Sequence, residues 1–117
     1  MGKKVLIAED EYITAELLRI TIQESGHEVI AVAYTGEDAV IKAGELAPDI
    51  VFMDISMEYR SAGIDACKSI KEQHPEIAVY FLSAYPKETY TKELALITFD
   101  GYLDKGEFDS AIELLNE

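Results

Sequence analysis

The chain has 117 residues, of which 49% are hydrophobic, and its 23 acidic and 10 basic side chains give a formal net charge of −13. This length predicts one domain with its own apolar core. The acidity argues against a nucleic-acid or anionic-membrane surface, because such surfaces need basic patches. No apolar run approaches the roughly 20 residues of a membrane span, and the first run reaches Glu9 too soon for a signal peptide. Cys67 is the single cysteine, expected to be a buried apolar residue, and its isolation indicates a reducing, cytoplasmic setting.

The N-terminal half of the chain alternates strand-like and helix-like patterns. The apolar run Val5–Ala8 predicts a buried strand, and a helical stretch follows at about Tyr12–Ser25. Glu28–Ala33 is rich in β-branched residues and predicts a second strand. A second helix is expected to begin at the N-cap Thr35 and to end before Pro48.

The C-terminal half continues the alternation. Ile50–Met53 predicts a third strand, continuously apolar as in a strand covered on both faces, and a helix follows at about Gly63–Gln73. Ala78–Leu82 predicts a fourth strand, followed by a less regular helix at about Lys87–Ile97. Gly101–Leu103 predicts a short fifth strand. The last helix is marked by apolar residues at helical spacing: Phe108, Ala111, Ile112 and Leu115.

Five strands that alternate with five helices imply a parallel sheet with right-handed crossovers. For one domain of this length we expect an α/β, flavodoxin-like three-layer sandwich with strand order 2-1-3-4-5. This order makes the first, third and fourth strands neighbours. The carboxyl ends of parallel strands share one edge of the sheet, which is where open α/β sheets place their sites.

Polar side chains stand at this predicted edge. Glu9 and Asp10 follow the first strand, Asp54 the third, Ser83 the fourth and Lys105 the fifth. Clustered carboxylates repel one another unless a hard cation or a lysine neutralises them. The cluster is therefore a candidate divalent-metal site that contains a reactive aspartate.

Two kinds of α/β site fit this pattern only in part. A flavin or nucleotide site needs a Gly/Ser/Thr-rich loop after the first strand, whereas the loop here is Glu9-Asp10-Glu11 and would repel phosphate. Haloacid-dehalogenase-like phosphatases have a nucleophilic aspartate after a strand and a second aspartate two residues on. Here Asp54 is followed at that position by Ser56.

The whole chain resembles the receiver domain of two-component response regulators, which is the third and best match. The resemblance implies that residues 1–117 form one receiver domain and that Asp54 accepts a phosphoryl group. Glu9 and Asp10 match the acidic pair that binds Mg²⁺ or Mn²⁺ together with Asp54. The carbonyl ligand of the family falls on the backbone of Ser56.

The resemblance also implies roles in signalling. Ser83 matches the hydroxyl that contacts the phosphoryl group, Lys105 matches the invariant lysine, and Tyr102 matches the switch aromatic. A sensor histidine kinase or phosphotransfer protein would be the donor. The output would be a protein target or a second copy that binds through the fourth helix, fifth strand and fifth helix, without nucleic acid or membrane. Such a domain is not an enzyme, although it takes part in its own phosphorylation and dephosphorylation. The alternative is a degenerate receiver that acts as a constitutive interaction module.

Three positions depart from the family pattern. Gly106 follows the lysine where a proline is usual, and Glu58 stands in the loop after Asp54 where the family usually has a proline. The glycine that begins the next helix, Gly63, comes about one residue late. These departures put the conformation of the loops in question, but every acid of the site is present.

Overall fold

The computed structural model describes residues 2–106 and 108–117. Its five strands form one sheet of order β2-β1-β3-β4-β5, with every neighbouring pair parallel. The strands are β1 (Lys4–Ala8), β2 (Glu28–Ala33), β3 (Ile50–Met53), β4 (Ala78–Ser83) and β5 (Gly101–Asp104). The helices are α1 (Tyr12–Glu24), α2 (Gly36–Leu46), α3 (Ala62–Gln73), the 3₁₀ turn η1 (Lys87–Tyr90), α4 (Thr91–Leu94) and α5 (Phe108–Leu115). The predicted fold class and strand order are confirmed.

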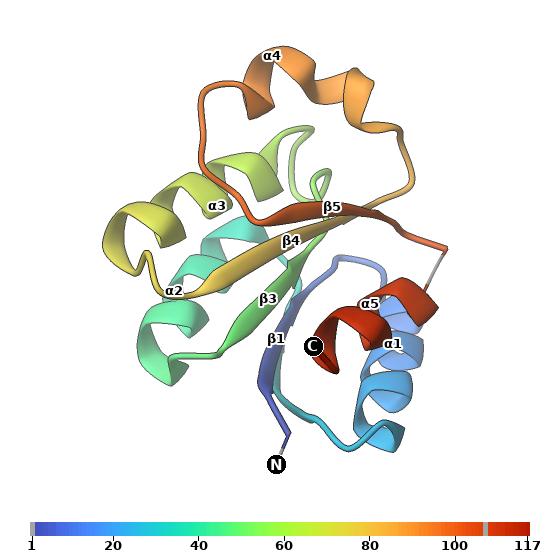
Figure 1. Cartoon of the computed structure of the whole chain (residues 1–117). Helices are drawn as coiled ribbons and strands as arrows, with labels where there is room; N and C mark the ends of the chain where they lie inside the picture. The colour runs from blue at the N-terminus through green and yellow to red at the C-terminus, as the bar shows by residue number, and fades with distance from the viewer. Residues whose placement is uncertain (1, 107) are drawn as a thin grey trace.

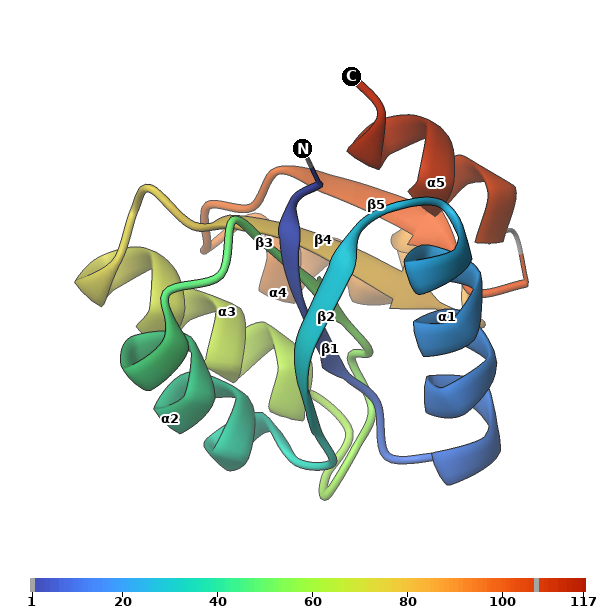
Figure 2. The ribbon, with the colours of Figure 1, turned by 90° about the horizontal axis from the view of Figure 1, so that it is seen from below.

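Helices cover both faces of the sheet. In Figures 1 and 2, α1 and α5 lie on one face, while α2, α3 and α4 lie on the other. Successive strand residues point to opposite faces, so Ile7 and Phe52 pack with α1 and α5. Leu6 and Val51 pack on the side of α2 and α3. Burial on both faces explains why β1 and β3 are continuously apolar.

The fourth helix is shorter than predicted. Instead of one helix over Lys87–Ile97, the chain forms the 3₁₀ turn Lys87–Tyr90 and then a single α-helical turn, Thr91–Leu94. The three consecutive residues Thr89–Thr91 have low helix propensity, because β-branched and aromatic side chains lose rotamer freedom against the preceding turn. The predicted length of this helix is therefore wrong, although its place between β4 and β5 is right.

Two expectations from composition can be followed in the structure. Cys67 is fully buried in α3, as predicted, and burial raises the pKa of its thiol to about 12. The thiol therefore stays protonated and unreactive near neutral pH. Within the described residues, no helix has the length and the apolar character needed to cross a membrane.

Candidate functional site

The polar residues predicted to form the site all lie at the carboxyl edge of the sheet. Backbone hydrogen bonds between neighbouring strands set their positions. The Asp54 N–H donates to the carbonyl of Ala8, at the end of β1, at 2.8 Å. The Lys105 N–H donates to the carbonyl of Ser83, the last residue of β4, at 2.9 Å. The residues that follow β1, β3, β4 and β5 are thereby brought to one edge.

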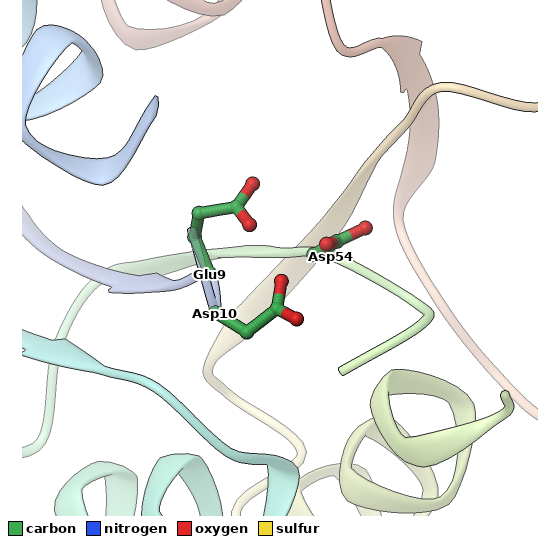
Figure 3. Close-up of side chains that lie close together, drawn as sticks. All are labelled: Glu9, Asp10 and Asp54. Atoms are coloured by element: carbon green, nitrogen blue, oxygen red, sulfur yellow. The ribbon is translucent and has the colours of Figure 1, made fainter. Parts of the chain in front are cut away.

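Three carboxylates converge at the centre of this edge. Glu9, Asp10 and Asp54 each offer an oxygen, and these oxygens lie within 4.8 Å of one another. Figure 3 shows two of them leaving the end of β1 and the third leaving β3. Glu9 and Asp54 are buried, whereas Asp10 is exposed. The cluster of three carboxylates is therefore buried at Glu9 and Asp54 and open to solvent at Asp10.

Lys105 is the cation of this group. Its Nζ lies 2.7 Å from Glu9 Oε1, 3.1 Å from Asp54 Oδ2 and 3.3 Å from Glu11 Oε1. Burial alone would lower the pKa of its amine, but the Glu9 and Asp54 carboxylates outweigh burial and hold that pKa above its usual range. Lys105 is therefore charged, and one positive charge faces several carboxylates. The contact with Glu11 was not predicted, although Glu11 is the third consecutive acid after β1.

The negative charge in the site is only partly neutralised. Burial raises the pKa of Glu9 to about 7, although Lys105 and the backbone N–H of Glu11 both act to lower it. Burial likewise raises the pKa of Asp54, against the effect of Lys105. A second cation at this place would stabilise the ionised form of both side chains.

Ser83 and Tyr102 are connected through Tyr85. Ser83 is buried, and its Oγ accepts a hydrogen bond from the Tyr85 N–H at 3.1 Å. The Tyr102 hydroxyl donates to the Tyr85 carbonyl at 2.7 Å, and its ring packs against Phe81 with 6.2 Å between centroids. A displacement of Ser83 would therefore reach the Tyr102 hydroxyl through the backbone of a single residue, Tyr85.

The loop after β3 is fixed where it leaves the site. Ile55 is fully buried, and its N–H donates to Asp54 Oδ1 at 2.9 Å. The Ile55 carbonyl accepts a hydrogen bond of 2.7 Å from the N–H of Gly63, in the first turn of α3. This close approach requires a glycine, because a Cβ at position 63 would lie 1.9 Å from the Asp54 carbonyl oxygen. Gly63, the glycine that comes late in the sequence, is therefore required for α3 to pack this closely against Asp54.

The far end of the same loop contacts the fourth helix. The Arg60 guanidinium forms an ion pair with Glu93 and lies 4.9 Å from the centre of the Tyr90 ring. It also donates to the carbonyl of Thr89 at 3.4 Å. Sequence reasoning missed this connection, since no local pattern relates residue 60 to residues 89–93. The contacts hold the short η1–α4 segment against the loop that leaves the site.

The chemistry of the donor set suits a small divalent cation. Mg²⁺ prefers carboxylate and carbonyl oxygens and keeps several waters of its own. Glu9, Asp10 and Asp54 supply hard oxygen atoms, and the exposed side at Asp10 leaves room for solvent. Ser56 is exposed in the loop two residues after Asp54. The residues present therefore fit Mg²⁺ or Mn²⁺.

Comparison with known proteins shows one family. The model of the response regulator receiver domain matches residues 5–115. The chain is 40% identical over 93 residues to the chemotaxis protein CheY of Thermotoga maritima, covering 80% of this chain and 77% of that protein. It is 33% identical over 106 residues to the alkaline phosphatase synthesis transcriptional regulatory protein PhoP of Bacillus subtilis, covering 90% of this chain but 43% of that protein. The chain thus spans less than half of that longer regulator.

Solved structures show the same relationship. The receiver domain of AraT, a response regulator from Geobacillus stearothermophilus, superposes with a TM-score of 0.80 at 30% identity. The match covers 98% of this chain and 93% of that one. The response regulator domain of CheB from Thermotoga maritima gives a TM-score of 0.83 at 27% identity, covering 99% of this chain and 92% of that one.

Proposed function

Because this chain belongs to the response regulator receiver domains, we propose that Asp54 accepts a phosphoryl group from a sensor histidine kinase or a phosphotransfer protein. The observation that carries the proposal is the Asp54 carboxylate, buried beside Glu9 and Asp10 and 3.1 Å from Lys105. In the transfer, the bond between phosphorus and the donor histidine nitrogen breaks as a bond to an Asp54 oxygen forms. Formation of an acyl phosphate on Asp54 from a small phosphodonor is the test of this proposal.

The side chains of the site have separate roles in this proposal. Asp10, Asp54 and the Ser56 carbonyl would hold Mg²⁺, with Glu9 beside them, and the bound ion would supply positive charge for the incoming phosphoryl group. The Ile55 N–H holds one Asp54 oxygen in place. Lys105 pairs with the other oxygen before the reaction and with a phosphoryl oxygen after it. The protein contributes position and charge, and Asp54 itself is the acceptor, so we propose a phosphoacceptor domain over residues 1–117 rather than an enzyme.

Ser83 and Tyr102 are the proposed readers of the phosphoryl group. Ser83 would donate its hydroxyl hydrogen to a phosphoryl oxygen, and the connection through Tyr85 would bias the Tyr102 ring. This is a shift between states that already exist in the unphosphorylated protein. The output surface would be the face of α4, β5 and α5, used by a protein target or a second copy. The single buried thiol supports a reducing, cytoplasmic setting.

An apolar face on α1 supports a protein donor. Four large apolar side chains of this one helix are exposed, and a fifth from the β2–α2 loop stacks on the first with 6.4 Å between ring centroids. They are Tyr12, Ile13, Leu17, Ile20 and Tyr34. Helix α1 begins next to the site, two residues after Asp10. Contiguous exposed apolar side chains mark interaction surfaces, so we propose that the helix of the donor that carries its histidine docks here.

Leu17→Asp is expected to slow phosphoryl transfer from a protein donor without affecting a small phosphodonor. Leu17 is 53% exposed, so a charge there leaves the fold intact but disfavours an apolar contact. Transfer from a phosphohistidine protein that labels the wild type should fall at least about tenfold, as for the loss of a central interface residue. Ile41→Asp, at a similarly exposed apolar position on α2, is the control and should behave as wild type. Equal slowing in both variants would argue against α1 as the docking face.

Mg²⁺ is expected to stabilise the protein, more strongly above neutral pH than below it. At free metal about tenfold above its Kd, the free energy of unfolding should rise by about 1.4 kcal/mol. Because burial raises the pKa of Glu9 from 4.5 to about 7, the folded state binds more protons in that window. The stability that protonated Glu9 contributes is therefore lost as the pH rises from 4.5 to about 7. Below about pH 7, Mg²⁺ must compete with the proton on Glu9, so its stabilising effect should be smaller there.

Thermal unfolding in EDTA and in millimolar Mg²⁺, at about pH 5.5 and about pH 8, checks this prediction. The difference in melting temperature should be larger at the higher pH, and Asp10→Asn should reduce it. Identical melting temperatures with and without Mg²⁺ at the higher pH would show that the carboxylates do not form a metal site.

A further inference from the structure

The N-terminus of α2 is capped from two directions. A helix begins with backbone N–H groups that have no partner within the helix. Thr35, the residue before α2, accepts a hydrogen bond from the N–H of Asp38 at 3.0 Å. The two N–H groups ahead of it, those of Gly36 and Glu37, donate instead to Glu58 in the loop after β3, at 2.8 and 3.2 Å. Helix α2 thus depends on a loop residue more than 20 positions further along the chain for two of these three hydrogen bonds.

Glu58 binds this helix end as a charged group. Burial would raise the pKa of its carboxyl, but hydrogen bonds from the backbone N–H groups of Gly36, of Glu58 itself and of Glu37 together outweigh burial and lower it. Both carboxylate oxygens are used, one for each N–H. The positive end of the helix dipole favours a negative charge here, and hydrogen bonds to an ionised acceptor are the stronger kind.

The contact between Glu58 and α2 restrains the loop that leaves the carboxylate cluster after Asp54. Ile55 is held on one side by its bonds to Asp54 and Gly63. Glu58 is held on the other side by α2. Only Ser56 and Met57 lie between these two fixed points. The Met57 N–H, which shares a peptide group with the Ser56 carbonyl, donates to the carbonyl of Tyr59, the residue after Glu58, at 3.2 Å. The direction of the Ser56 carbonyl therefore depends on where Ile55 and Glu58 are held.

We propose that Glu58 is a positioning residue of the metal site: by fixing the loop to the start of α2, it aims the Ser56 carbonyl at the ion. This inference rests on the proposed function. Receiver domains usually have a proline at this position, whose ring restricts the backbone covalently. Glu58 cannot restrict its own backbone in that way, and its two hydrogen bonds to α2 supply the restriction.

Calorimetric titration with Mg²⁺ of the whole chain, together with unfolding and amide exchange in EDTA, tests the inference. Glu58→Ala should weaken Mg²⁺ binding about tenfold, the effect typical of residues that orient metal ligands. Glu58→Gln keeps one acceptor oxygen and should weaken it less. In EDTA, the amides of Ser56 and Met57 should exchange faster in Glu58→Ala than in the wild type.

Two control variants separate positioning from its alternatives. Thr35→Ala removes the third hydrogen bond of the same cap and should lower the melting temperature while leaving the Mg²⁺ affinity unchanged. Glu37→Gln removes an exposed carboxylate at the same helix end and should also leave it unchanged. If Thr35→Ala weakens binding as much as Glu58→Ala, the effect is only helix stability and the inference is overturned. If Glu37→Gln weakens Mg²⁺ binding as much as Glu58→Ala, the effect comes only from the loss of a negative charge near the site, and the inference is overturned.

The inference and the proposed function can fail separately. If the wild type binds Mg²⁺ and Glu58→Ala binds it equally well, only the role of Glu58 is refuted. If the wild type shows no Mg²⁺ binding, both the metal site and the positioning role are refuted.

Discussion

Asp54→Ala is expected to abolish covalent phosphorylation of this protein. Incubation of the wild type with acetyl phosphate and Mg²⁺ should add the mass of one phosphoryl group, and the variant should stay at the unmodified mass. The reason is chemical, because an acyl phosphate needs a carboxylate, and alanine has none. Intact-protein mass spectrometry measures the outcome directly.

Asp109→Ala is the matched control for this experiment. Asp109 is an exposed aspartate in the first turn of α5 and is not one of the clustered carboxylates, so its loss should leave the yield of phosphoprotein unchanged. EDTA should suppress the reaction of the wild type as completely as Asp54→Ala does. Equal phosphoprotein yields from the wild type and Asp54→Ala would refute the assignment of Asp54. A wild type that is never phosphorylated would support the constitutive interaction module instead.

The strand order and the members of the site were predictable because they depend on local patterns. A continuous apolar run such as Ile50–Met53 identifies a strand covered on both faces, and the first polar residue after it must lie at the sheet edge. This reasoning brought Asp54 and Lys105 together, although they are 51 positions apart in the sequence. No contact had to be known in advance, since the parallel topology alone places all carboxyl ends on one side.

The contacts of the loop after Asp54 were not predictable in the same way. Glu58 binds the start of α2 and Arg60 binds Glu93, and each partner is more than 20 positions away with no periodic pattern to indicate it. The sequence showed only that Glu58 stands where a proline is usual. The shortened fourth helix has a related origin, because its first turn is held by contacts with Arg60 rather than by its own helix propensity.

Gly63→Ala is expected to destabilise the fold and to disturb the site together. A Cβ at this position would meet the Asp54 carbonyl oxygen at 1.9 Å and Ile55 Cα at 2.8 Å. Both are backbone atoms, so no side chain can rotate away and the strand end must move. Forcing extra atoms into a packed site typically costs about 1–3 kcal/mol. Urea unfolding should show that the free energy of unfolding falls by about the upper end of this range. The shift also displaces the Asp54 carboxylate, so the Mg²⁺ affinity of the molecules that remain folded should fall.

Gly44→Ala provides a control of opposite sign. Gly44 is exposed in the interior of α2, and a Cβ there meets only the far end of the His74 side chain, at an ordinary 3.5 Å. Alanine in an exposed helix stabilises by about 0.5–1 kcal/mol relative to glycine, so this variant should unfold at higher urea concentration with unchanged Mg²⁺ affinity. If Gly63→Ala is as stable as Gly44→Ala, the close approach of α3 to Asp54 is not a constraint. If Gly63→Ala is much less stable than Gly44→Ala, a glycine is needed at position 63. The reason is that its N–H binds the Ile55 carbonyl and so helps to hold Asp54 in place.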